Sequence, residues 1–200
     1  TNIMIFGVLA ILIFSPFYMP YYLSCNSIET VDYNLEEAND IWNQYEEHNY
    51  AKRTTPNSNS IVIADNLINN NEVFLLRYWE PFIFDENELD WSEDPYDDWT
   101  WLFYFHSLRM VSYLVNAYEL SNNVTYLEKA QWFIESWAEH NPCSKQQASP
   151  RAWDDHSTAN RITTFIYFWD HYRNSEIFDN NFANQFLNLL RLHGEYTAID

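Results

Sequence analysis

The residues best suited to chemistry lie in one stretch, residues 151–161, which reads RAWDDHSTANR. It gathers an indole, two carboxylates, an imidazole, an amide and two guanidinium groups. A guanidinium can bind a carboxylate through two parallel hydrogen bonds, and an imidazole or an amide can bond a hydroxyl. This set of groups therefore suits either a polyhydroxylated ligand or a network of internal partners.

The spacing of these residues predicts a helix over about 155–173. Large apolar residues recur every three or four positions from 162 to 172, as on the buried side of an amphipathic helix. Asp154 or Asp155 is placed to cap its first turn. His156 and Asn160 are four residues apart and share a face with Thr163/Thr164. We therefore expect a polar face on the first turns of a helix whose far side is buried.

Each candidate residue also has a plain structural interpretation. Arg161 can bind a ligand carboxylate, or it can pair internally with Asp154 or with a helix C-terminus. His156 can bond a sugar oxygen or support another residue, and the aromatic residues can stack on sugar rings or fill the core. Core packing is the more common role for aromatic side chains and for His106. The predicted ligand-binding residues are Trp153, Asp155, His156, Asn160 and Arg161, with Tyr96 and His106 behind them.

The charge of the chain restricts its partners. Its formal net charge of −19 disfavours nucleic acid and anionic membrane surfaces. Four of the ten basic residues nevertheless fall between positions 145 and 173: Lys145, Arg151, Arg161 and Arg173. This concentration indicates either a place for an anion or an offset for neighbouring carboxylates.

The sequence indicates neither a metal nor a cofactor. Asp154, Asp155 and His156 are adjacent, so a helix would direct them apart, and no H-E-x-x-H pattern is present. Only two glycines occur, which disfavours a phosphate-binding loop. Cys25 and Cys143 form no C-x-x-C pair and leave one disulfide possible, with lipidation of Cys25 as a weaker alternative.

The order of apolar and polar segments predicts three regions. Residues 1–25 are expected to be a signal peptide or membrane anchor, residues 26–60 a polar segment, and residues 61–200 a helical domain interrupted at its C-terminus. The predicted location is periplasmic or secreted, with any membrane contact through the apolar N-terminal segment. The high aromatic content, 19%, and the scarcity of glycine favour an all-α fold of antiparallel helical hairpins. The expected helices are 35–48, 101–120, 124–139, 155–173 and 181–199, with a short helix and a strand over 61–70 and 73–79.

Two motifs resemble a known family. Trp91-x-x-Asp94-Pro95, followed by Trp101 and by the segment 105–108 (FHSL), resembles the "W-x-x-(D/N)-P … W … L-H-x-L" pattern of the heparinase II/III-like polysaccharide lyases. Trp153 and Arg161 likewise resemble that family's "W … R" segment. The resemblance implies the N-terminal part of an incomplete α/α toroid and an acidic polysaccharide as partner.

The same resemblance implies β-elimination beside a uronic acid, with Trp153 and Arg161 in the substrate groove. The family's Asn-His pair does not map onto His193, because no asparagine precedes it, so the catalytic residues are unknown and are expected beyond this segment. Two other classes stay open: a non-catalytic, membrane-tethered module for carbohydrate binding or surface-polysaccharide assembly, and a helical scaffold that binds proteins.

Overall fold

The computed structural model describes residues 30–44, 52, 54–143 and 149–197. Within these residues the chain is mainly helical, which confirms the predicted all-α class. Its two strands form only a short antiparallel ribbon, in place of the longer strand expected over 73–79. The elements in chain order are α2 (Leu35–Gln44), α3 (Ser58–Asn70), β1 (Glu72–Val73), β2 (Phe82–Ile83), α4 (Trp99–His106), α5 (Arg109–Ser121), α6 (Thr125–His140), α7 (Asp155–Tyr172) and α8 (Asn180–Thr197).

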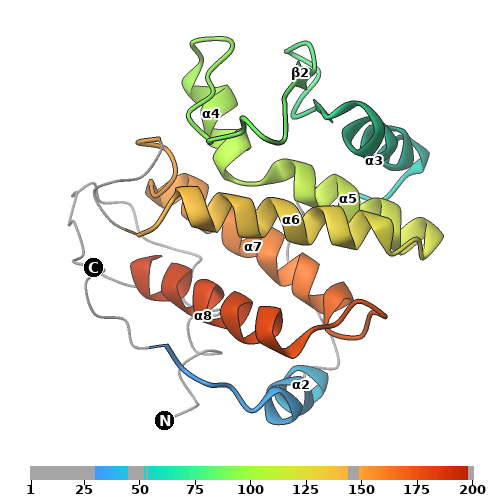
Figure 1. The fold of residues 1–200 in the computed structure, drawn as a ribbon, viewed down its shortest axis with the longest axis vertical. Helices are drawn as coiled ribbons and strands as arrows, with labels where there is room; N and C mark the ends of the chain where they lie inside the picture. The colour runs from blue at the N-terminus through green and yellow to red at the C-terminus, as the bar shows by residue number, and fades with distance from the viewer. Residues whose placement is uncertain (1–29, 45–51, 53, 144–148, 198–200) are drawn as a thin grey trace.

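The longer helices pack against one another in a stack (Figure 1). Helix α5 packs against α3, α6 and α7, and α8 packs on α7. The α2 helix lies at the far side of α8, as Figure 1 shows in blue at the bottom of the view. Helix α7 thus lies in the middle of the stack, where one of its faces must be buried.

Aromatic side chains fill the centre of the molecule. The ring of Trp91 lies 4.9 Å from that of Phe105, which in turn stacks 4.6 Å from Trp101. All three side chains are almost fully buried. Each of these large rings buries an extensive apolar surface, so a small number of them can form a hydrophobic core. The tryptophans of the first family-like motif therefore stabilise the fold.

The helix expected over 101–120 is broken in two. Leu108 has φ 54° and ψ 42°, a left-handed conformation that is uncommon for leucine, and it separates α4 from α5. The break frees the last carbonyls of α4, and α7 satisfies them: Arg161 Nη1 donates to the His106 carbonyl at 2.5 Å and Thr164 Oγ1 to the Ser107 carbonyl at 3.3 Å. These long-range bonds stabilise the bend.

No helix within the described ranges is both long and apolar enough to cross a membrane. This finding corrects the predicted location, which was periplasmic or secreted with any membrane contact through the apolar N-terminal segment. The apolar stretch on which that prediction relied, within residues 1–25, lies outside the described residues. Cys143 is disulfide-bonded, and Cys25 falls in the same undescribed stretch.

Candidate functional site

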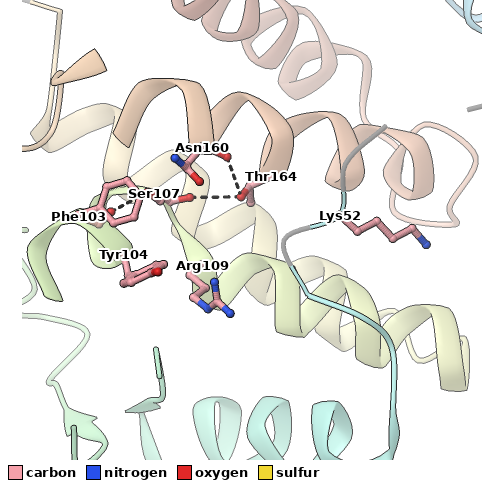
Figure 2. Close-up of a pocket in the computed structure, with 7 residues that line it drawn as sticks. All are labelled: Lys52, Phe103, Tyr104, Ser107, Arg109, Asn160 and Thr164. Carbon is pink, nitrogen blue, oxygen red and sulfur yellow. Dashed lines mark hydrogen bonds between the residues drawn. The ribbon is translucent and has the colours of Figure 1, made fainter. Parts of the chain in front are cut away.

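A polar pocket lies where α4, α5 and α7 meet (Figure 2). Its volume is about 360 Å³. Helices α4 and α7 meet in the same chain order, because Trp99 lies near Arg151 just before α7 and Ser107 bonds Thr164 farther along. The lining residues are Lys52, Phe103, Tyr104, Ser107, Arg109, Asn160 and Thr164.

Arg109 supplies an available positive charge to this pocket. Its guanidinium carbon lies 5.1 Å from the centre of the Tyr104 ring, and its Nε donates to the Tyr113 hydroxyl at 3.4 Å. Among the residues that the structure describes, no carboxylate forms an ion pair with it. Lys52 differs, since its ammonium pairs with Glu119 at 2.9 Å. In a chain with a net charge of −19, an unpaired arginine in a pocket indicates an anionic ligand.

The start of α5 adds to this positive potential. Helix α5 begins at Arg109, and no side chain caps its first turn. The first N–H groups of a helix lack partners within it and carry the positive end of its dipole. An anion beside Arg109 would therefore also approach the N-terminal end of α5.

The opposite wall of the pocket comes from the polar face of α7. The Asn160 amide donates to the His156 carbonyl at 2.7 Å, and the Thr164 hydroxyl lies 3.4 Å from the Asn160 carbonyl. The predicted shared face thus reaches the pocket through Asn160 and Thr164. His156 lies one turn nearer the start of α7, with a side chain 73% exposed and its Nδ1 2.8 Å from Asp155.

The other face of α7 holds a buried polar cluster around Arg161. The Arg161 side chain is 0% exposed and lies 3.7 Å over the Trp137 ring. Its Nε donates to His193 Nε2 at 2.7 Å, its Nη1 to the His106 carbonyl, and its Nη2 to the Thr158 hydroxyl at 3.4 Å. In this structure Arg161 contacts protein groups and not the pocket, so it holds α4, α7 and α8 together.

The two histidines of this buried cluster are neutral. Burial, and to a lesser degree the charge of Arg161, lowers the pKa of His106 from 6.5 to about 3. The same two causes lower the pKa of His193 well below its ordinary value. His106 Nδ1 accepts from the Trp137 indole at 3.3 Å, and His193 Nδ1 lies 2.7 Å from the Leu189 carbonyl. Each ring thus has a fixed orientation in the core.

The remaining predicted residues divide between the interior and the surface. Trp153 is buried, and its indole donates to the Asn141 carbonyl at 2.9 Å. Tyr96 is half-buried, and its hydroxyl donates to the Glu80 carbonyl at 2.5 Å. Asp155 is exposed beside His156. Of the seven predicted ligand-binding residues, only Asn160 lines the pocket.

The basic residues near α7 mostly offset neighbouring carboxylates. Arg151 pairs with Asp154 at 2.9 Å, and Arg173 lies 3.8 Å from Asp170. Lys145 lies outside the described residues. The available positive charge in the pocket therefore comes from Arg109, which the local concentration of basic residues did not indicate.

One cluster has metal-ligating side chains close together, contrary to the expectation that they diverge. Ligand atoms of Asp154, Asp155 and His156 lie within 4.8 Å of one another. Asp154 is the N-cap, with an extended backbone rather than a helical one, so its side chain does not follow the helical direction. Its carboxylate already accepts from the Ser157 amide at 2.7 Å and from Arg151. These bonds use the oxygens that a metal would need.

Comparisons with known proteins identify related chains. A family model described as Heparinase II/III N-terminus matches residues 19–199. The crystal structure of heparan sulfate lyase HepC from Pedobacter heparinus matches with a TM-score of 0.61 and 19% identity, and that of a HepC mutant with 0.64 and 18%. Each match covers 75% of this chain and 23% of the other, so the chain spans about a quarter of the length of these structures. The likeness confirms the predicted fold, part of a helical toroid. No curated protein matches the chain.

Proposed function

The chain belongs to the heparinase II/III N-terminal family, and we propose that its α4–α7 pocket binds an acidic sugar unit of a polysaccharide that the protein cleaves by β-elimination. The availability of the Arg109 guanidinium carries this proposal. The similar HepC structures are of a heparan sulfate lyase, and heparan sulfate is an acidic polysaccharide. A charge of −19 would repel such a polymer, so a local cationic contact is needed to hold it.

The pocket supplies what substrate binding for β-elimination requires. A uronic acid loses its C5 proton more readily when its carboxylate is neutralised, because the negative charge that develops on that group is then stabilised. Arg109 would hold the carboxylate, and the uncapped first turn of α5 would add to the positive potential. Asn160 and Tyr104 would bond the hydroxyl groups of the sugar ring.

We assign no base and no acid for proton transfer to the described residues. His106 and His193 are fully buried, so neither can reach a sugar carbon in the pocket. A general base must come within hydrogen-bond distance of the proton that it removes. The described residues therefore act in this proposal by binding and orienting the sugar.

The test is the binding of a heparan sulfate oligosaccharide by the Arg109→Gln variant, measured by calorimetry. Loss of a charge-assisted contact should weaken binding by about tenfold or more, and binding should fall less steeply with added salt. Arg191→Gln is the matched control, because Arg191 lies on α8 outside the pocket and pairs with Glu195. Equal binding by Arg109→Gln and the wild type would refute the proposal. Ultraviolet absorbance of an unsaturated product separates a lyase from a binding module.

A further inference from the structure

The face that forms the pocket continues past it towards the starts of α4 and α7. Trp99 precedes Phe103 by four residues on α4, and His156 precedes Asn160 by four on α7. Residues four apart lie on one helix face, separated by about 6 Å along the axis. The starts of the two helices meet at Arg151, whose guanidinium lies over the Trp99 ring and bonds Asp154. Trp99 and His156 therefore both lie towards this end, one turn before the pocket residues of their own helices and on the side away from Arg109.

Trp99 is an exposed aromatic side chain with a fixed support. Trp99 is 59% exposed as a residue, and the Arg151 guanidinium carbon lies 4.2 Å from the centre of its ring. Arg151 is in turn held by Asp154, the residue that caps α7. A large ring that is held in place before binding loses little conformational freedom when a ligand stacks on it. The exposed part of the indole is therefore suited to stacking on a sugar ring.

The charge at this end is opposite to that at the pocket. Asp97 and Asp98 precede α4, and Asp154 and Asp155 lie at the start of α7; among the described residues beside them, Arg151 carries the opposing charge. These carboxylates would repel an acidic sugar, whereas Arg109 attracts one at the other end. The Asp155 carboxylate and the adjoining His156 imidazole are both exposed and can bond the hydroxyl groups of an uncharged sugar.

We propose that Trp99, together with Asp155 and His156, forms a stacking subsite for an uncharged sugar unit next to the acidic unit in the pocket. This inference rests on the proposed function of the pocket. The two ends then bind two different units of one glycan, and their opposite charge sets the direction in which the glycan lies. A polymer in which every unit is acidic would bind in the pocket, and Trp99 would not contribute to its affinity.

The test compares two oligosaccharides in calorimetric binding experiments. Hyaluronan oligosaccharide alternates glucuronate with uncharged N-acetylglucosamine, and oligogalacturonate has an acid on every unit. Trp99→Ala should weaken hyaluronan binding about tenfold, as loss of a well-placed aromatic contact does, and leave oligogalacturonate binding unchanged. Tyr78→Ala is the matched control, since Tyr78 is 71% exposed beside the Arg77 guanidinium and lies outside the pocket lining. It should change neither affinity.

The outcomes separate this inference from the proposal on which it rests. If Trp99→Ala weakens neither oligosaccharide, or weakens both equally, the subsite is refuted. If Arg109→Gln weakens neither, the pocket itself is refuted as an anion site. An unchanged unfolding midpoint for Trp99→Ala, expected for an exposed residue, shows that any loss of binding is local.

Discussion

The two faces of α7 differ in what their polar groups contact. On the inner face, Arg161 is fully buried and bonded to the His106 carbonyl and to His193. On the outer face, Asn160 lines a pocket and His156 is exposed. Both sets of residues come from the same eleven-residue stretch. Membership of this charged stretch therefore does not show which residues can contact a ligand. The face of α7 on which a residue lies decides whether it is accessible to one.

The inner face supports the outer one. Arg161 of the inner face holds the His106 carbonyl, and Thr164, which lines the pocket, holds the Ser107 carbonyl. At this point the chain bends through Leu108 and starts α5 at Arg109. The bend brings Arg109, the first residue of α5, to the pocket. We therefore interpret Arg161 as a positioning residue, and four predictions test the division between the faces.

The largest expected effect is that of Arg161→Ala on stability. The substitution leaves His193 Nε2 and the His106 carbonyl without a donor and opens a cavity over Trp137, so unfolding should become easier by about 3 kcal/mol or more. Urea unfolding at pH 7 measures this. Arg161→Lys should restore little, because an ammonium lacks the planar fork of donors. A loss below about 0.5 kcal/mol for Arg161→Ala would contradict the supporting role.

The second effect concerns pH. The pKa of His106 is lowered to about 3 in the folded protein, whereas the unfolded chain binds a proton below about 6.5. The contribution of His106 to the free energy of unfolding is therefore complete above pH 6.5. As the pH falls from 6.5 towards 3, the unfolded chain binds a proton that the folded protein does not, so the free energy of unfolding declines by about 1.4 kcal/mol per pH unit. His106→Gln, which keeps an acceptor for the Trp137 indole, should reduce the slope of unfolding free energy against pH between 6 and 4. An unchanged slope would show that His106 is not kept neutral by the core.

A smaller effect is expected for Thr164→Val. The valine keeps the shape but loses the hydrogen bond to the Ser107 carbonyl, which should cost about 1 kcal/mol in unfolding free energy. Thr163→Val is the control, since the Thr163 hydroxyl bonds the Asn160 carbonyl of its own helix at 2.7 Å. If the two variants lost equal amounts of unfolding free energy, the hydrogen bond from Thr164 to the Ser107 carbonyl would have no particular role in stabilising the bend.

The smallest effect on stability is expected for Asn160→Ala on the outer face. The unfolding free energy should change by less than about 0.5 kcal/mol. Binding of a heparan sulfate oligosaccharide should weaken about fivefold, as expected for one neutral hydrogen bond. If Asn160→Ala destabilised the protein without weakening oligosaccharide binding, Asn160 would have a structural role and not a ligand-binding one.

Much of the fold could be predicted from local patterns. The helices α6, α7 and α8 begin and end within about two residues of their predicted bounds, because their apolar spacing is regular and Asp154 caps α7 as expected. The break at Leu108 could not be predicted. No glycine or proline marks it, and the bonds that hold it come from α7, more than fifty positions away in the sequence.

The candidate site was harder to predict for the same reason. Asn160 and Thr164 followed from helical spacing, but Arg109 reaches the pocket only because of the bend. Arg161 was expected in the groove, and the packing of α4 and α8 against α7 encloses it instead. Burial of a long polar side chain depends on these tertiary contacts, which the sequence pattern alone does not contain.

The most direct test of the division between the faces is a crystal structure with a bound heparan sulfate oligosaccharide. An acidic group of the sugar should lie within hydrogen-bond distance of the Arg109 guanidinium, with Asn160 beside the same unit. Arg161 should still donate to the His106 carbonyl and to His193. A sugar acid bound directly to Arg161, with Arg109 free of the sugar, would contradict this division between the two faces of α7.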